Sequence, residues 1–491
     1  MQVQRESPLL HQAVACLIVA APISIGAYWA YSARSPQSTH RKQRQGMSRS
    51  MLAALGCTLL LDFFCTDQYQ PNMPDMAEDF NVAPVQMGAT IQVHLFTSAI
   101  FMLLFGPLSD SIGRRPVILG GQALLTVSTL CCGFSETYSW FVVGRIFQGM
   151  AAAVTPVILS TIPDCYTDMA ERLKHQGALA TLMQLGPLAA PATGGFLADA
   201  FGWRLPFFIL SSLSGLLLVF SFFVVEESAP PSVDVNYAAC ARRTLVDRSR
   251  FWILVACLFI KSFFDGLAGS NGIVLRRDLH QSLRGASVCI TLMAFAGTVG
   301  SYIPAHLPWS ALEALRACMG PLLCSAGFLA FTGLLYSDSL SWFMAATLFA
   351  EVAIWTPYVS ALCQFTQGIE DIAGSASSLL TALSFLGSSL VSLLVVVLAE
   401  TGAAGFLLAL GATLLLIALS LWLGPLSCTL ALPALPALPL TEDNQDNRVS
   451  WIEDCNLLED CRLIEDCKDH NGPGPKTKPA SCFEERESSA A

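Results

Sequence analysis

A short polar connection between two long apolar runs constrains this chain more than any other feature. It reads Gly106-Pro-Leu-Ser-Asp-Ser-Ile-Gly-Arg-Arg-Pro-Val117 and contains Asp110, Gly113 and the adjacent Arg114 and Arg115. A membrane crossing needs about 20 apolar residues, and both flanking runs are that long. Arginine and lysine are enriched in cytosolic connections. The sequence therefore predicts a tight cytosolic hairpin between two membrane-spanning helices.

The composition agrees with a membrane protein. Of 491 residues, 53% are hydrophobic and 13% are charged, against about 25% charged in soluble domains. The net charge of -10 comes mostly from residues 441–491, which hold 13 acidic and 6 basic side chains. No basic stripe suited to nucleic acid is present. Most of the 17 cysteines lie in apolar runs, where cysteine behaves as a small hydrophobic residue.

Apolar windows predict an all-α polytopic membrane protein with twelve crossings. The first six cover approximately 51–70, 86–107, 116–134, 139–161, 175–198 and 203–225. The second six cover approximately 251–270, 286–304, 315–336, 341–363, 374–400 and 403–424. We expect five regions: an extension at 1–50, two six-helix bundles at 51–226 and 251–425, a cytosolic linker at 227–250 and a cytosolic tail at 426–491.

The two terminal regions leave alternatives open. The apolar run at 13–31 precedes a basic arm at 41–49, and it is an extra thirteenth crossing, a targeting segment or a stretch ahead of a true start at Met47. The tail begins with Ala-Leu-Pro repeats, which cannot stay helical. Three Glu-Asp-Cys units follow at six-residue spacing. No histidine lies among them in a zinc spacing, so we expect a disordered tail and no metal site.

Charged residues inside apolar runs are the first candidates for function, because a charge in lipid costs several kcal/mol. At 1.5 Å per residue, Asp62 lies about 16 Å into the first predicted helix and Asp67 about 24 Å. Arg145, on the fourth helix, lies about 9 Å from the outer face, between the depths of the two aspartates. A charge pair between Arg145 and one of the two aspartates is therefore geometrically possible.

Such a carboxyl group suits proton exchange. Burial disfavours its charged form and a nearby guanidinium favours it, so protonation changes as water reaches the site. If a cationic substrate uses the same carboxylate, proton and substrate compete for one negative charge and exchange becomes obligatory. The structural alternative is an Asp–Arg pair that only locks two helices together.

Several motifs resemble those of one transporter family. The hairpin, at Gly106, Asp110, Gly113, Arg114 and Arg115, is similar to the signature loop of the major facilitator superfamily. That resemblance implies a fold of two six-helix bundles in which this loop acts as a conformational switch.

The end of the first predicted helix narrows the resemblance. Thr66-Asp-Gln-Tyr-Gln-Pro-Asn-Met-Pro74 is similar to the run found in the bicyclomycin-resistance (Bcr/CflA) branch of drug:proton antiporters, with Asp67 and Tyr69 at informative positions. Arg145-Ile-Phe-Gln-Gly149 matches an element whose arginine is associated with proton coupling in relatives. The resemblance implies that Asp67, Tyr69, Arg145 and Gln148 belong to the proton-coupling and substrate site.

The fifth predicted helix carries a second element of this kind. Gly186, Ala190 and Gly194 are four residues apart, which leaves one face bare for a neighbouring helix. Pro187 and Pro191 weaken the backbone ladder beside them, which favours a bend that can repack. Ordinary small-residue packing explains the same pattern. The stretch Gly186–Gly195 nonetheless resembles the antiporter element of drug exporters.

The second half carries fewer signals. Lys261 and Asp265 are four residues apart on one helix face, so we expect them to pair. Glu351 lies about 15 Å into the tenth helix with no cation nearby in sequence, and we expect a second titrating site there. The signature hairpin is degenerate around 305–316, so the resemblance is good over 51–226 and patchy over 251–425.

These observations predict a multi-pass plasma-membrane carrier with a cytosolic C-terminus that exports small amphipathic or cationic compounds in exchange for protons. We expect a monomer whose partners are the lipid bilayer and its substrate, with no cofactor and no nucleic acid. The alternatives are a carrier for a dedicated metabolite (a polyamine, amino acid or peptide), a uniporter, and a non-transporting receptor or scaffold. No phosphate-binding glycine loop or catalytic triad is evident, so we expect no enzyme.

Overall fold

The computed structural model describes residues 46–166, 169–228, 242, 245–306, 310–366 and 373–426. Every regular element in these residues is a helix. The N-terminal apolar run at 13–31, most of the linker and the tail beyond 426 lie outside the described residues, so the expectations for them stay predictions.

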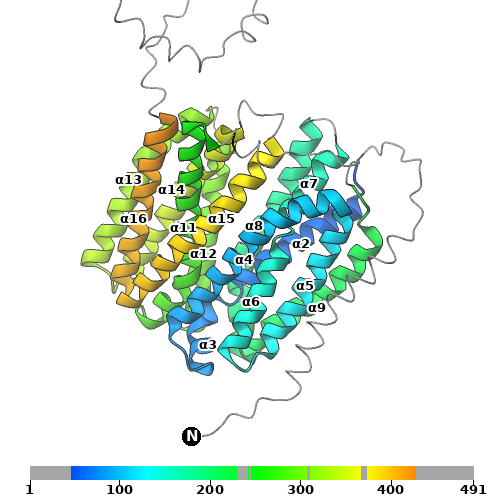
Figure 1. Ribbon diagram of the computed structural model, residues 1–491. Coiled ribbons are helices and arrows are strands. Elements are labelled where there is room, and N and C mark those ends of the chain that lie inside the picture. The colour runs from blue at the N-terminus through cyan, green and yellow to red at the C-terminus, as the bar shows by residue number, and fades with distance from the viewer. Residues whose placement is uncertain are drawn as a thin grey trace, which may run out of the picture. The chain divides into compact units, whose positions relative to one another are not determined.

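The helices form two consecutive groups of six (Figure 1). The first group contains α2 (Arg49–Asp67), α4 (Pro84–Ile112), α5 (Arg114–Phe134), the pair α6 (Tyr138–Ala152) and α7 (Thr155–Cys165), α8 (Met169–Phe201) and α9 (Arg204–Val224), with η1 (Gln70–Asn72) and α3 (Met73–Asp79) between α2 and α4. The second group contains α11 (Arg248–Arg277), α12 (Leu283–His306), α13 (Ala311–Leu335), α14 (Leu340–Thr366), α15 (Ala373–Leu398) and α16 (Ala403–Leu421), with η3 (Ala399–Thr401) and η4 (Trp422–Leu426).

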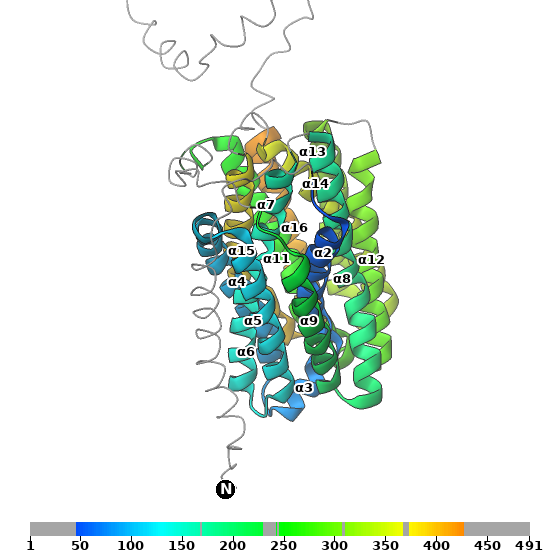
Figure 2. The same ribbon diagram turned by 90° about the vertical axis from the view of Figure 1, so that its right-hand side faces the viewer.

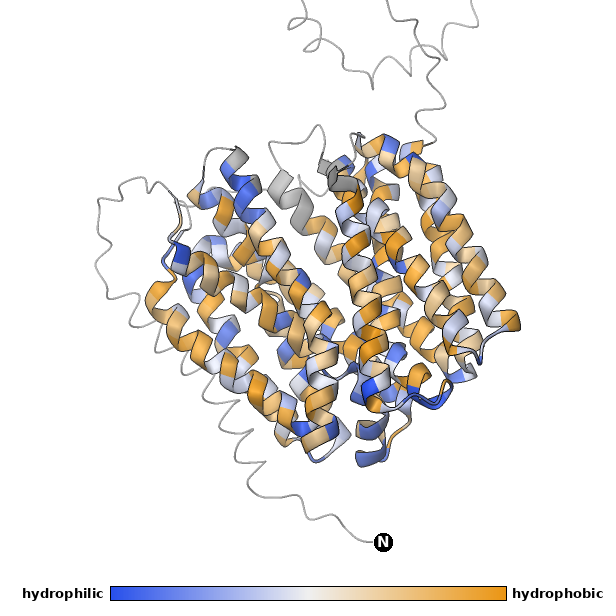
Figure 3. Cartoon of the chain, turned by 180° about the vertical axis from the view of Figure 1, so that it is seen from behind, coloured by the Kyte–Doolittle hydropathy of each residue, from blue (hydrophilic) through white to orange (hydrophobic). Residues whose placement is uncertain are grey.

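Eleven helical segments of the described residues are long and apolar enough to cross a membrane. The remaining long helix, α8, has 33 residues, with Glu171, Arg172 and Lys174 in its first turns and small or polar residues such as Gln184, Gly186 and Thr193 along the rest. Large apolar side chains stay exposed along the outer helices, among them Leu216, Phe223, Leu334, Leu390 and Leu415. Figure 3 shows apolar residues along the helices and hydrophilic residues gathered at their ends. This pattern fits lipid around the helices, because an apolar surface of this extent is rare in water.

Each group has its own packing. In the first group α2 packs on α8, and α5 on α6 and α9, as Figure 2 shows for the face that presents α2, α5, α6 and α9. In the second group α11 packs on α15, and α13 on α14 and α16. The groups meet where α4 lies against α11 and α15, and where α8 lies against α12. The observed helices agree with the predicted all-α, two-bundle fold.

The fourth crossing is broken near its middle. Ala153 and Val154 stand between α6 and α7 in a turn, and Pro156 follows at the second position of α7. Proline has no N–H group and cannot donate to the carbonyl of Ala152, four residues earlier. The crossing is therefore two shorter helices, which places helix ends beside α2 and α5.

Close approach of helices is made possible by glycine. A Cβ atom at Gly186 would lie 2.5 Å from that of Phe63 on α2, and one at Gly194 would collide with the Gln68 carbonyl. The bare face predicted for this helix thus packs on the first crossing. The neighbouring Gly195 faces Ser287 of α12, in the other group. The helix α8 runs without interruption through Pro187 and Pro191.

Candidate functional site

Four of the predicted site residues, Asp67, Tyr69, Arg145 and Gln148, gather around the end of α2. Arg145 is fully buried, and its Nη1 donates to the carbonyl oxygen of Cys65 at 3.2 Å and to Oε1 of Gln148 at 2.6 Å. Its guanidinium carbon lies 5.1 Å from the centroid of the Tyr69 ring. The Tyr69 hydroxyl shares a 2.9 Å hydrogen bond with Thr90 on α4. Arg145 is therefore positioned by α2, α4 and its own helix.

The possible charge pair of Arg145 with an aspartate does not form in this conformation. The nearest partner of Asp67 is Gln70, whose Nε2 donates to Oδ1 at 2.7 Å. The helix α2 ends at Asp67 and the chain turns directly into η1, so the carboxylate follows that turn. Counting residues gives depth along a helix but not the direction of a side chain at its last residue. Asp67 still lies within electrostatic range of Arg145 and of Lys261 on α11.

Arg145 retains unused hydrogen-bonding capacity. Its Nε and Nη2 atoms are buried and have no partner within the part of the chain that the structure describes. An unsatisfied buried charged group is costly, by about 1–3 kcal/mol or more. Such a group in a transporter is a candidate for contact with water, a proton carrier or substrate.

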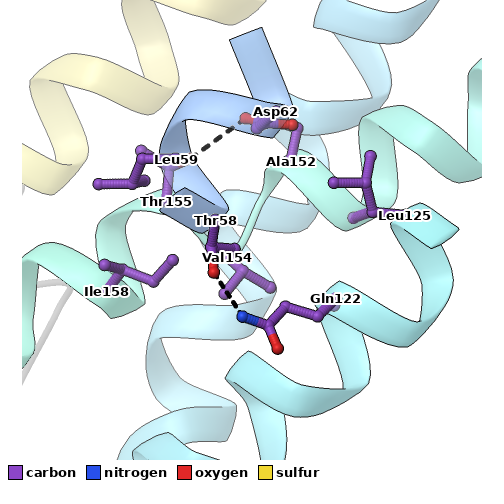
Figure 4. Close-up of a pocket in the computed structure, with 11 residues that line it drawn as sticks. Thr58, Leu59, Asp62, Gln122, Leu125, Ala152, Val154, Thr155 and Ile158 are labelled. Atoms are coloured by element: carbon purple, nitrogen blue, oxygen red, sulfur yellow. Dashed lines mark hydrogen bonds between the residues drawn. The ribbon is translucent and has the colours of Figure 1, made fainter. Parts of the chain in front are cut away.

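Asp62 lies about one helical turn before this cluster along α2, beside a separate small pocket. Its Oδ2 accepts a 3.4 Å hydrogen bond from Thr155 at the start of α7. Figure 4 shows Asp62 and Thr58 on one helix, with Thr155 and Gln122 on its neighbours, around a small cavity. Asp62 makes no ion pair in the described residues, and the charges of Arg145 and Asp67 act on it with opposite signs.

The second group contributes Glu351 and a lysine–aspartate pair. Glu351, on α14, is 4% exposed and accepts a 3.3 Å hydrogen bond from Nε1 of Trp355. It does not join the cluster around Arg145. Lys261 and Asp265 form the ion pair predicted for them, at 2.5 Å, and Ser388 donates to the other oxygen of Asp265 at 2.7 Å.

A glutamine that the sequence analysis did not single out ties the two groups together at this level. Gln92, on α4, donates to the Asp265 carbonyl at 3.0 Å and accepts from Ser392 of α15 at 2.5 Å. No motif marks this residue. Its signal is an amide side chain well inside an apolar run, where polar groups form hydrogen bonds between membrane helices.

The hairpin residues form a charged network at one end of the first group. Arg114 contacts Asp110 at 2.6 Å and Asp164 of α7 at 3.1 Å. Gly113 has φ +103°, a region that disfavours any side chain. At Gly106, by contrast, a Cβ atom would have no other atom within 4 Å, so space does not require glycine there.

Glu227 completes this network and was missed by the sequence analysis. Its two oxygens accept the backbone N–H groups of Arg114 at 2.8 Å and Arg115 at 3.2 Å. A carboxylate at these positions satisfies free N–H groups and complements the helix dipole at the start of α5. The available signal was a glutamate pair directly after the sixth apolar run.

Ion pairs between the two groups lie at the opposite end. Arg276 of α11 pairs with Asp75 of α3, and Arg284 of α12 contacts Asp199 of α8 at 2.6 Å. Two close approaches accompany them, Gly195 with Ser287 and Gly272 with the Gln70 carbonyl. In this conformation the two groups are joined tightly at the end that carries α3.

Comparison with known proteins identifies relatives. The family model described as "Major Facilitator Superfamily" matches residues 51–392. A chloramphenicol resistance protein of Pseudomonas aeruginosa is 26% identical over 343 residues, covering 67% of this chain and 80% of the relative. The multidrug resistance protein MdtL of Escherichia coli O45:K1 is 29% identical over 184 residues, covering 38% of this chain. The match spans about half of MdtL (47%).

Solved structures show the same fold. The human organic anion transporter MFSD10 (TETRAN) superposes with a TM-score of 0.58 at 18% identity, covering 76% of this chain and 99% of that protein. A bacterial homolog of the human lysosomal transporter Spinster, in an inward-facing and occupied conformation, gives 0.58 at 14% identity, covering 78% and 96%. These neighbours are transporters and not enzymes. With its family match, its resistance-protein relatives and its two groups of membrane helices, the chain is a transporter of the major facilitator superfamily.

Proposed function

We propose that this transporter exports small amphipathic or cationic compounds in exchange for protons. The observation that carries the proposal is the state of Asp67. The residue is 9% exposed, makes no ion pair in the described residues, and lies within electrostatic range of Arg145 from its own group and Lys261 from the other. Its charge is therefore sensitive to how the two groups are placed.

The proposed cycle follows from this position. When the groups separate at the end that carries α3, Arg276 and Arg284 lose their partners, Lys261 moves relative to Asp67, and water reaches the carboxylate. The stabilisation of the ionised Asp67 carboxylate by nearby positive charges then changes. This alters how strongly the carboxylate binds a proton relative to a cationic substrate. Asp62 and Glu351 are further buried carboxyl groups that can exchange protons in the same cycle.

The substrate class is supported by the relatives and by the surroundings of Glu351. The names of the two bacterial relatives refer to chloramphenicol and multidrug resistance. Near Glu351, the rings of Phe264 and Trp355 lie 4.6 Å apart, and Tyr358 packs on Trp355 at 5.7 Å. Aromatic rings beside a carboxyl group suit amphipathic compounds with a ring or a positive charge.

We place the chain in the plasma membrane with α3 outside and the hairpin at 106–117 inside, acting as a monomer without a cofactor. The arginines of the hairpin support this orientation. The described conformation is then the one closed to the outside.

The proposal is tested in proteoliposomes with a pH gradient and a panel of compounds that includes chloramphenicol. Accumulation that requires an acidic lumen supports antiport. Transport that is independent of the gradient favours a uniporter, and transport of polyamines, amino acids or peptides alone favours a dedicated metabolite carrier.

A further inference from the structure

Polar side chains of α2 and α4 meet inside the first six-helix group. The Tyr69 hydroxyl shares its hydrogen bond with Thr90. One turn further along, Oγ1 of Thr66 lies 3.3 Å from Nε2 of His94. The residue number falls on α2 while it rises on α4, so the two helices run in opposite directions. Equal steps along both helices therefore lead to residues at the same level.

The next step leads to Asp62 on α2 and Ser98 on α4. Residues four apart share a helix face, so Asp62 lies on the face of Thr66, and Ser98 lies on the face of His94. Oδ1 of Asp62 and Oγ of Ser98 are both buried and have no hydrogen-bond partner within the described residues. The polar faces of α2 and α4 thus continue as far as Asp62, with two polar atoms free to bond water.

His94 is the residue of this set that can both accept and release a proton. Its side chain is 3% exposed, and Nδ1 is buried with no partner in the described part of the chain. The helix α6 packs closely here, since a Cβ atom at Gly149 would collide with the His94 carbonyl. The charged groups that act on the ring are Arg145 of α6 and Lys261 of α11, and both are positive. Their repulsion favours passing a second proton on over keeping it.

Asp67 and Asp62 are too far apart to exchange a proton directly. They are five residues apart on α2, which is about 7.5 Å along the axis and about 140° around it. Proton transfer follows hydrogen bonds of about 3 Å. Thr66 lies between the two aspartates in the sequence, and His94 meets it from α4. Arg145 and Lys261 act on Asp67 as they do on the ring, so His94 and Asp67 share one electrostatic environment.

We propose that His94 relays protons between Asp67 and Asp62. A proton that leaves Asp67 enters the ring at Nδ1, and the proton on Nε2 leaves for the Thr66 hydroxyl, whose own hydrogen passes toward Asp62. Asp67 loses one proton, Asp62 gains one, and the ring ends as its other tautomer and turns over before the next transfer. Water molecules bonded to Nδ1, to Oδ1 of Asp62 and to Oγ of Ser98 complete the path, because buried water bonds to polar atoms that lack protein partners.

This inference rests on the proposed function and gives its proton a path inside the first six-helix group. Gradient-driven uptake requires net proton movement and therefore the relay. Counterflow exchanges compound for compound with no net proton movement, so it does not require the relay. Native uptake that ignores the pH gradient would contradict the export proposal itself. Native uptake that needs the gradient, with equal uptake by a His94 variant, would contradict the relay alone.

The test uses the full-length protein in proteoliposomes with an acidic lumen, with chloramphenicol and the aromatic cation ethidium as probes. His94→Gln keeps a side chain that can bond to Thr66 but cannot take up a proton. We expect its gradient-driven uptake to fall at least about tenfold, with counterflow within about twofold of native, because a proton-transfer group is lost. Loss of lumenal protons on compound addition, followed with the trapped dye pyranine, should fall by the same factor.

Matched variants separate the relay from a structural role. Thr66→Ser keeps the hydroxyl and should keep gradient-driven uptake, whereas Thr66→Val has a similar shape and should lose it. His280→Gln changes an exposed histidine between α11 and α12 and should transport as the native protein does. Melting temperatures of all variants check folding, and the Thr66 pair decides the matter if His94→Gln is unstable. Native uptake in His94→Gln or Thr66→Val, or counterflow that falls as far as gradient-driven uptake, would overturn the relay.

Discussion

The guanidinium of Arg145 lies over the ring of Tyr69, 5.1 Å from its centroid, and not against the carboxylate of Asp67. A cation over an aromatic face is stabilised by about 2 kcal/mol or more when desolvated. In this conformation the ring and Gln148 position the arginine, while Asp67 is left without an ion pair in the described residues. The separation leaves Asp67 open to exchange.

This arrangement predicts different losses for two substitutions of Tyr69. Tyr69→Phe keeps the ring and loses the hydrogen bond to Thr90, so unfolding free energy should fall by about 1 kcal/mol. Tyr69→Leu also loses the cation–π contact and should cost about 2 kcal/mol more. Denaturant titration of the purified protein measures both. Equal losses in the two variants would show that the ring does not support Arg145.

The close approach of α8 and α12 predicts a strong effect of one methyl group. In Gly195→Ala the new Cβ would lie 2.8 Å from the Cβ of Ser287, and overpacking should cost about 1–3 kcal/mol. The double variant Gly195→Ala with Ser287→Gly should recover most of that loss. Gly177→Ala is the control, because Gly177 lies on the same helix with open space around it. A loss in Gly177→Ala as large as in Gly195→Ala would contradict this account.

Glu227 should stabilise the hairpin through its charge. In Glu227→Gln the hydrogen bonds from the N–H groups of Arg114 and Arg115 weaken. We expect the free energy of unfolding, measured by thermal denaturation, to fall by about 0.5–2 kcal/mol. Glu78→Gln removes an exposed carboxylate elsewhere and should have little effect. Similar melting temperatures for the two variants would rule out the proposed role of Glu227.

The pair of Lys261 and Asp265 should behave as a unit. Asp265→Asn leaves a partly buried ammonium group unpaired, and the expected cost is about 3–5 kcal/mol. The double variant Lys261→Met with Asp265→Leu should be markedly more stable than Asp265→Asn, because no charge then remains unpaired. Comparing their unfolding free energies tests this. A double variant that is the less stable of the two would contradict it.

The sequence allowed the fold and part of the site to be predicted. Local spacing was enough for the Lys261–Asp265 pair, since residues four apart share a helix face, and for the bare face of α8 at Gly186 and Gly194. Counting residues along the helices correctly put Asp67 and Arg145 at similar depths. It could not show that their side chains do not pair, because it ignores rotation about the helix and the end of α2 at Asp67.

The contacts that depend on distant segments were not predictable in this way. Glu227 lies more than a hundred residues from the N–H groups it binds, and Gln92 reaches α11 and α15 of the other group. Such features depend on the packing of three helices and leave no periodic pattern in the sequence.

The central claim is that Asp67 couples substrate movement to protons. The most direct measurement is compound accumulation in proteoliposomes with an acidic lumen, because protons leaving the lumen would drive the compound inward. We predict that the native protein accumulates the compound and that the gradient-driven rate of Asp67→Asn is at least tenfold lower. A factor of ten corresponds to about 1.4 kcal/mol of lost coupling. Counterflow of the unlabelled compound should be retained in the variant. Accumulation by Asp67→Asn that equals the native level, or native accumulation without any pH gradient, would contradict the account.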